Sequence, residues 1–382
     1  MKENKEFSAH SKMLKRKGIQ KMLLLFIFVL VILSACSTKE DVQDYTLDAK
    51  IGQMLMFGFR GKDVNEEWVQ AIHGQITQYN LGGILLLGYN VRSPQQIDSL
   101  MTYLHSAPHQ FPVLFGIDQE GGSVQRLSKS KGFTGFPSAQ KVADSLTVDE
   151  AYDLYRDLAK ECKQYGFNYI LAPVVDVNVN PECPVIGALG RSFSSNPAVV
   201  SSYAGAFVRA IDKEGLLSCL KHFPGHGSAN TDSHQGLTDV TQTWQPYELD
   251  PYTSLIGQGL ARSIMSAHIY HAGVDSIYPA SLSYQHIQMK LRTDMNYHGV
   301  VISDDLQMGA INNYYSLEEI VIQAIKSGSD ILIFSQYFNP DQNLPLQVIN
   351  IIKNAIATGE ISEERINESF NRIIKMKQRI KA

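Results

Sequence analysis

The hydrophobic pattern of the chain changes at about residue 45, where short apolar runs begin to alternate with longer amphipathic segments. Eight of these runs are almost continuously apolar, as expected for parallel strands that are buried on both faces. They are Met54–Phe59, Gly83–Leu87, Val113–Ile117, Tyr169–Ala172, Leu216–Leu220, Ile264–Ala267, Val300–Ile302 and Ile331–Phe334. The pattern predicts eight parallel strands.

The segments between the runs carry helix signals. Residues 64–79 repeat apolar side chains at helical spacing, at Trp68, Ile72 and Ile76. Further helices are predicted to start at the capping residues Thr147, Asn196, Ser316 and Ser362. Eight strand–helix units predict an α/β fold, a single (β/α)8 TIM-type barrel with extended catalytic loops over residues 45–382. A doubly wound sheet is the alternative, which a count of eight strands disfavours.

The first 35 residues have the features of an export signal. A basic segment precedes the apolar run Met22–Leu33, which is shorter than the roughly 20 residues that a membrane-spanning helix needs. The run ends in Leu33-Ser34-Ala35-Cys36, which resembles a bacterial lipobox. We therefore expect residues 1–35 to be a lipoprotein signal peptide, Cys36 to be acylated and residues 36–44 to form a polar tether. The alternative is a plain secretory signal. The expected protein is exported and held at a membrane by its lipid, on the periplasmic face or the cell surface.

Charge and cysteine content narrow the function further. The full chain has a net charge of −4, and removal of residues 1–35, with seven basic and two acidic side chains, leaves −9. An acidic protein is poorly suited to bind nucleic acid. Cys162, Cys183 and Cys219 have no metal-type spacing and are expected to be buried without disulfides. No cofactor is expected, and the protein is expected to be a monomer.

The candidate chemistry lies where predicted strands end, which is where (β/α)8 barrels hold their active sites. The run 216–220 leads into Lys221-His222-Phe223-Pro224-Gly225-His226-Gly227, and Asp232-Ser233-His234 follows. Asp232 and His234 alternate along a loop, so the carboxylate could orient the imidazole. An Asx-type turn with a solvated histidine is the alternative.

Other predicted strands also end in polar residues. Asp118-Gln119-Glu120-Gly121-Gly122, Pro173–Asp176, His268 and Asp304-Asp305 follow four of them. Each has a structural alternative. Asp304 could cap the next helix, although Asp305 could fill that role, and Asp118 with Arg126 could form a structural ion pair, while Arg191 could be an ordinary loop residue.

Together these motifs resemble glycoside hydrolase family 3, in particular the bacterial exo-β-N-acetylglucosaminidases of the NagZ type. The resemblance extends from Ile51 to about Ile333 and is carried by four segments in a fixed order. These are Ile117–Gly122, Lys221–Gly227, Asp232–His234 and Ile302–Leu306.

The resemblance implies retaining hydrolysis of terminal β-linked GlcNAc, with peptidoglycan fragments or a related glycan as the carbohydrate substrate. It implies Asp304 as nucleophile and His234, oriented by Asp232, as acid/base. The positions implied to bind the terminal sugar are Asp118, Arg126, Arg191, Lys221 and His222. The chemistry agrees, because an anion at the anomeric carbon and a proton donor at the glycosidic oxygen are what retaining cleavage needs.

Other functions stay open at this point. A family 3 β-glucosidase is one alternative, although those enzymes generally place a glutamate acid/base on a second domain. Phosphate could replace water as the acceptor, because a histidine base repels an anion less than a carboxylate does. A metal-dependent hydrolase built from His222, His226, His234 and His268, or a catalytically silent glycan-binding protein, would belong to different classes. No metal is expected.

Overall fold

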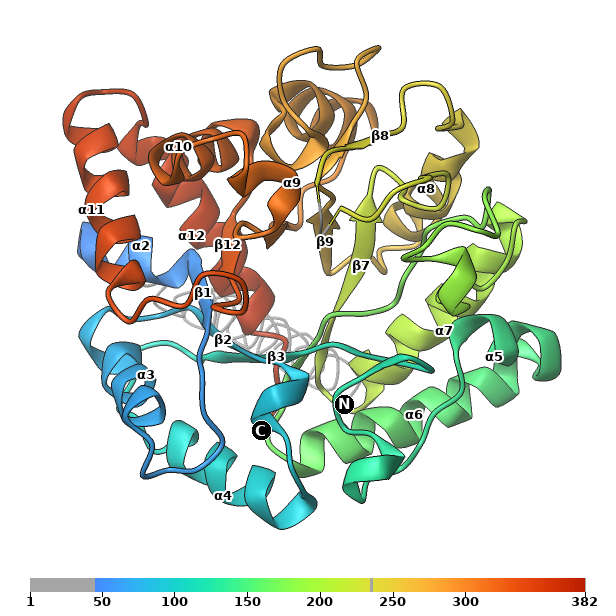
Figure 1. Ribbon diagram of the computed structural model, residues 1–382, viewed down its shortest axis with the longest axis horizontal. Coiled ribbons are helices and arrows are strands. Elements are labelled where there is room, and N and C mark those ends of the chain that lie inside the picture. The colour runs from blue at the N-terminus through green and yellow to red at the C-terminus, as the bar shows by residue number, and fades with distance from the viewer. Residues whose placement is uncertain (1–44, 234–235, 382) are drawn as a thin grey trace, which may run out of the picture. The chain divides into compact units, whose positions relative to one another are not determined.

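Eight parallel strands close into a barrel in the computed structural model, which describes residues 45–233 and 236–381 (Figure 1). The strands are β1 (Leu55–Gly58), β2 (Gly83–Leu86), β3 (Leu114–Ile117), β6 (Tyr169–Ile170), β7 (Leu217–Phe223), β9 (Ser263–Ser266), β11 (Val300–Asp305) and β12 (Ile331–Phe334). They follow one another around the barrel in chain order, and β12 pairs with β1 to close it. Each strand overlaps one of the eight apolar runs, so the predicted barrel is confirmed.

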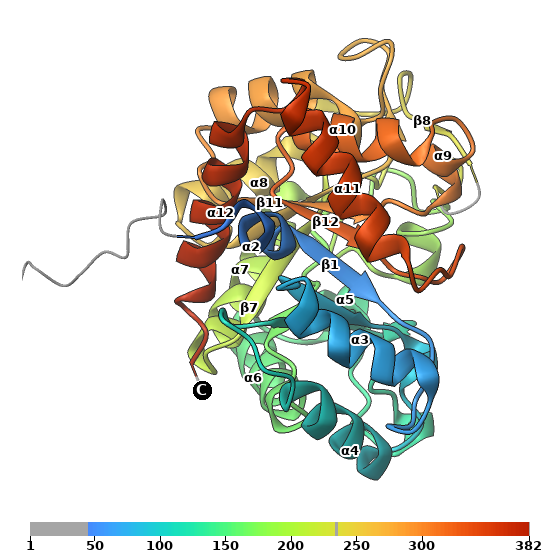
Figure 2. The ribbon, with the colours of Figure 1, turned by 90° about the vertical axis from the view of Figure 1, so that its left-hand side faces the viewer.

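Helices surround the strands, as Figure 1 shows. The longer ones are α3 (Glu67–Gln78), α4 (Pro94–His105), α6 (Val148–Gln164), α7 (Pro197–Lys213), α8 (Asp250–Gly257), η7 (Gln285–Asp294), α10 (Leu317–Ser327), α11 (Leu344–Ala357) and α12 (Glu363–Lys377). Shorter helices are α2 (Leu47–Gln53), α5 (Ala139–Ser145) and α9 (Gly309–Asn312). The first and last helices of this unit, α2 and α12, lie side by side (Figure 2).

The four predicted caps determine where four helices begin. The Thr147 hydroxyl accepts a hydrogen bond from the backbone N–H of Glu150, whose carboxylate accepts one from the Thr147 N–H, a complete capping box. Asn196 caps α7 through the N–H of Ala198. The Ser316 and Ser362 hydroxyls cap α10 and α12 by accepting from N–H groups three residues further on. These side chains satisfy N–H groups that have no partner inside the helix.

The barrel interior is filled by side chains. Met56 on β1 points toward β2 and β3, and each of these two strands has a glycine beside the Met56 side chain, Gly83 and Gly116. A Cβ at Gly116 would collide with the Met56 methyl group. The two glycines therefore make room for one large apolar side chain.

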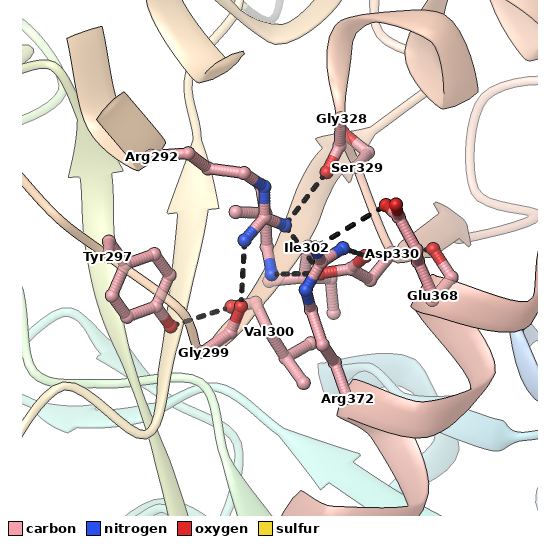
Figure 3. Close-up of polar contacts among 12 residues, drawn as sticks. Arg292, Tyr297, Gly299, Val300, Ile302, Gly328, Ser329, Asp330, Glu368 and Arg372 are labelled. Carbon is pink, nitrogen blue, oxygen red and sulfur yellow. Dashed lines mark hydrogen bonds and ion pairs between the residues drawn. The ribbon is translucent and has the colours of Figure 1, made fainter. Parts of the chain in front are cut away.

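A buried ion cluster joins α12 to the amino-terminal ends of the strands (Figure 3). Asp330, fully buried before β12, pairs with Arg292 at 2.7 Å, Arg372 at 3.1 Å and Arg365 at 3.5 Å. It also accepts hydrogen bonds from Ser369 and from the backbone N–H of Val301. Burial alone would raise the pKa of Asp330, but the three guanidinium groups outweigh it and the pKa lies below its usual range. Removing the partners of this buried charge would be strongly destabilising.

The predicted signal peptide, Cys36 and the tether lie outside the described residues. Among those that are described, no helix is both long enough and apolar enough to cross a bilayer.

Candidate active site

The carboxyl ends of the strands bring predicted site residues from distant parts of the chain to one rim. Asp118 directly follows β3, Lys221 and His222 lie near the end of β7, and Asp304 lies near the end of β11. Lys221 Nζ is 2.8 Å from Asp118 Oδ1, although the two residues are 103 positions apart. The barrel thus places the expected cation and carboxylate in direct contact.

Asp118 and Lys221 belong to a wider network of alternating charges. Arg126 pairs with the other Asp118 oxygen at 2.9 Å. Lys221 also contacts Glu120 at 2.7 Å, and Glu120 accepts two hydrogen bonds of 2.8 Å from Arg191. Arg126 is about a quarter exposed, while Lys221, Glu120 and Arg191 are nearly covered. Three cations and two carboxylates are therefore held in fixed positions.

The local sequence explains how Asp118 and Glu120 act together. They are two residues apart in the extended segment that continues from β3 into β4 (Gln119–Gly121), which pairs with β5 (Val124–Gln125). The side chain of Gln119, between them, accepts hydrogen bonds from the backbone N–H groups of Arg126 and Leu127. This hairpin therefore orients Arg126 toward Asp118.

The charges in the network stabilise one another. Burial acts to raise the pKa of Asp118 and of Glu120, but the adjacent cations reverse this effect. The pKa of Asp118 falls well below its usual range, and that of Glu120 falls to about 2. Burial acts to lower the pKa of Lys221, whereas the two carboxylates raise it above its usual value. All three groups are ionised at neutral pH.

Asp176 fixes the orientation of His222. This carboxylate is fully buried after β6, and its Oδ2 is 2.7 Å from His222 Nδ1. Its other oxygen accepts hydrogen bonds from the backbone N–H groups of His222 and His226. A carboxylate can only accept here, so His222 Nδ1 carries a proton and Nε2 lies 3.4 Å from Arg191 Nη2. The imidazole is thereby held in one orientation and one tautomer.

The predicted acid/base loop is attached to the barrel at Ser233. The Ser233 hydroxyl is 3.0 Å from His226 Nε2, and its carbonyl accepts a hydrogen bond from the N–H of Ala310 in α9. Burial, followed by the proximity of His222, lowers the pKa of His226 to about 4, so the His226 ring is neutral. Asp232 is half-buried. His234 lies outside the described residues, so its role stays a prediction.

Asp304 and Asp305 occupy different environments. Asp305 is buried, and its carboxylate accepts hydrogen bonds from the backbone N–H groups of Gln307 and Ser335 and from the Ser335 hydroxyl. Burial raises the pKa of Asp305 to about 6. Asp304 is half-buried, and its Oδ1 accepts from the N–H of Asp305. Asp305 is thus committed to local structure, although it does not cap the next helix as the sequence suggested, because the N-cap of α9 is Met308. Asp304 is left as the candidate nucleophile.

Two residues of the site had no assigned role in the sequence interpretation, and a third, His226, was considered there only as a metal ligand. Glu120 bridges Lys221 and Arg191, Asp176 orients His222, and His226 contacts Ser233. The available signal was position, because Glu120 and Asp176 both lie just beyond predicted strands. The positions of Glu120 and Asp176 in the sequence do not indicate which distant side chain each of them contacts.

The histidines considered for a metal site make other contacts. His268 lies 2.6 Å from the Ser281 hydroxyl through Nδ1 and 2.9 Å from the Asp305 carbonyl through Nε2. His222 is engaged by Asp176. Within residues 45–233 and 236–381, no group of three or more histidine, cysteine or acidic side chains is arranged to hold a metal ion.

A closed parallel barrel that gathers paired charges and a half-buried carboxylate at its carboxyl-terminal rim is an arrangement suited to enzymes. Residues 46–376 match the model of the glycosyl hydrolase family 3 N-terminal domain. The chain belongs to glycosyl hydrolase family 3.

Two similar proteins are named β-hexosaminidases. A β-hexosaminidase named LpqI from Mycobacterium tuberculosis is 34% identical over 336 residues, covering 86% of this chain and 82% of the relative. β-Hexosaminidase A from Pseudoalteromonas piscicida is 33% identical over 332 residues and covers 80% of this chain, but the chain spans only about half, 54%, of that relative.

Solved structures agree with the barrel. A family 3 β-N-acetylglucosaminidase from Paenibacillus sp. str. FPU-7 superposes with a TM-score of 0.79 at 32% identity. The match covers 88% of this chain and 62% of that one.

Proposed function

We propose that this protein is a retaining exo-β-N-acetylhexosaminidase that releases terminal β-linked GlcNAc by hydrolysis. The observation that carries the proposal is the buried charge network around Lys221, on the same rim as the half-buried carboxylate of Asp304. The names of the relatives and of the matching structure support the same activity.

The charge network is proposed to hold the terminal sugar. Its cations and carboxylates are already paired and ionised, so they present donors and acceptors to sugar hydroxyls without first reorganising. Asp118, Arg126, Arg191, Lys221 and His222 are the proposed binding residues. The pairing also keeps the site near neutrality, which suits an uncharged sugar.

Hydrolysis is proposed to proceed in two steps. In the first, an oxygen of Asp304 attacks C1 of GlcNAc, the bond from C1 to the glycosidic oxygen breaks, and His234 gives its proton to that oxygen. In the second, His234 takes a proton from water, the water oxygen bonds to C1, and the ester to Asp304 breaks. Two inversions at C1 retain the β configuration. Asp232 would orient the imidazole throughout.

The natural substrate and location are further parts of the proposal. The lipobox at Cys36 supports an exported protein held at a membrane by a lipid. An exported enzyme of this kind would meet peptidoglycan or its fragments, which end in β-linked GlcNAc. Incubation with GlcNAc-MurNAc and GlcNAc-anhydroMurNAc fragments, with the products identified, distinguishes the aglycones and also separates hydrolysis from phosphorolysis.

The activity is tested with an aryl β-N-acetylglucosaminide and the variant Asp304→Asn. We expect kcat/KM to fall at least about a thousandfold, since the covalent route is lost. Asp157→Asn is the matched control, because Asp157 lies exposed on α6 and pairs only locally with Lys160. Full activity of the Asp304 variant, or a preference for glucosides in the wild type, would contradict the proposal.

A further inference from the structure

Three aromatic side chains gather beside the candidate site. Tyr89 lies in η2 (Gly88–Asn90) after β2, while Tyr337 and Phe338 follow β12. The rings of Tyr89 and Tyr337 stack with centroids 6.0 Å apart and planes 18° apart. Phe338 meets Tyr337 edge-on, at 5.1 Å and 89°. We call these three rings the aromatic corner.

A cation from the segment that follows β1, the strand between β2 and β12, contacts the aromatic corner. The guanidinium carbon of Arg60 lies 4.9 Å from the centre of the Tyr89 ring and 5.5 Å from that of Tyr337. Arg60 also donates hydrogen bonds to the carbonyls of Gln336, at 3.1 Å, and Tyr337, at 2.5 Å. One side chain thus fixes both the two stacked rings and the backbone that carries one of them.

The loop that bears Tyr337 and Phe338 is tied to the segment of the candidate nucleophile. Gln307 donates to the Asn339 carbonyl at 2.7 Å and accepts from the Gln336 N–H at 2.7 Å. The Ser335 hydroxyl donates to Asp305, the immediate neighbour of Asp304. The aromatic corner is therefore coupled directly to the strand end that carries the proposed nucleophile.

Tyr89 contacts the segment that follows β12. Its hydroxyl lies 3.5 Å from the Ser335 carbonyl. Burial raises the pKa of Tyr89 to about 12, and the nearby Asp305 adds to this rise. Tyr89 and the loop that carries Tyr337 therefore both contact Ser335, whose hydroxyl donates to Asp305.

The loop that follows β12 exposes the rings of Tyr337 and Phe338 and contains an unfavourable backbone conformation. Tyr337 is 50% exposed and Phe338 is 37% exposed, whereas Gln336 before them is 2% exposed. Gln336 adopts a φ of +58°, which is unfavourable for a residue other than glycine. A simple connection from β12 to α11 would need neither a left-handed glutamine nor exposed rings. Rigidly held, exposed aromatic side chains on a loop of the rim indicate binding.

We propose that the aromatic corner binds the pyranose ring that is bonded to the terminal GlcNAc, on the leaving-group side of the cleaved bond. A pyranose presents a face of C–H groups that stacks on an aromatic ring, and hydroxyls around its edge that can reach the tyrosine oxygens. A patch of three rings bearing two hydroxyls matches a single amphipathic sugar. This inference rests on the proposed function and adds a preference for a sugar as leaving group.

The test compares two substrates that differ only on the leaving-group side. N,N′-Diacetylchitobiose has a sugar there, whereas β-GlcNAc fluoride has no ring. For Tyr337→Ala in the full chain, we expect kcat/KM on the disaccharide to fall about tenfold, the loss of one stacking contact. Hydrolysis of the fluoride should stay within about twofold of the wild type. Tyr337→Phe keeps the ring and should retain disaccharide activity.

Tyr284→Ala is the matched control, because Tyr284 is a 55% exposed tyrosine at the start of η7 in the outer ring of helices. It should leave both substrates unaffected. Equal losses of Tyr337→Ala on both substrates, or no loss on either, would overturn the aromatic corner as a sugar site. A wild type that hydrolyses neither substrate would instead overturn the proposed function, and the inference with it.

Discussion

Replacement of Asp176 by asparagine tests how the site holds His222. The two backbone N–H groups, of His222 and His226, both bond to Oδ1 of Asp176, whereas Oδ2 bonds to His222 Nδ1. An asparagine would keep its carbonyl oxygen on the backbone groups and turn its NH₂ toward Nδ1. The imidazole would then have to carry its proton on Nε2, facing the guanidinium of Arg191 at 3.4 Å.

The expected loss of activity follows from the charged hydrogen bond that the substitution removes. A hydrogen bond to a charged group contributes about 1.5–3 kcal/mol, and about 1.4 kcal/mol corresponds to tenfold. We therefore expect kcat/KM of Asp176→Asn on an aryl β-N-acetylglucosaminide to fall by about 10- to 100-fold. The pKa of Asp176 lies below its usual range, because His222 and the hydrogen bonds outweigh the effect of burial, so the charge itself is part of the interaction.

A matched control separates this effect from lost stability. Asp330→Asn also removes a fully buried carboxylate, but at the amino-terminal end of the barrel. It should unfold at lower denaturant, by about 3–5 kcal/mol in the free energy of unfolding, while the folded fraction keeps its kcat/KM. An Asp176→Asn protein that is folded and has wild-type kcat/KM would refute the proposed control of the His222 tautomer.

Two further predictions concern the pH dependence of stability. Burial raises the pKa of Glu248 from 4.5 to about 8, so between these pH values the folded protein holds a proton that the unfolded chain releases. The resulting contribution to the stability of the fold is complete below pH 4.5 and is lost as the pH rises through 8. Glu248→Gln should therefore narrow the difference in melting temperature between pH 5.5 and 8.5, and an unchanged difference would contradict this. Burial lowers the pKa of Lys377 from 10.5 to about 7, so the fold binds fewer protons than the unfolded chain and stability rises between pH 7 and 10.5. Lys377→Met should flatten that rise in urea unfolding measured at pH 7 and 9.5, whereas a slope like that of the wild type would rule the explanation out.

The barrel could be predicted because strands buried on both faces are apolar along their length. The end of β7 could not be placed in the same way. The apolar run that predicts β7 stops at Leu220, yet the strand continues to Phe223. Lys221 and His222 stay in the buried strand because Asp118 and Asp176 compensate their polarity, and those partners come from other strands. A hydrophobic pattern shows which residues avoid water, but it does not show which polar residues pair with partners that are distant in the sequence.

The candidate site could be predicted only in part for the same reason. Motifs identified Asp118, Lys221 and Asp304 at strand ends, and the structure brings the first two into contact. Asp176 and the aromatic corner had no motif. Their roles depend on contacts between loops that follow different strands, which the order of the residues does not show.

The most direct test of the account is to trap the covalent intermediate. A fluorinated GlcNAc fluoride forms a glycosyl ester that is hydrolysed slowly, so the labelled residue can be identified by peptide mass spectrometry. The account predicts a single label on Asp304 and none in the Asp304→Asn protein. An active enzyme labelled on Asp305 or another side chain, or one whose GlcNAc product first appears as the α anomer, would contradict it.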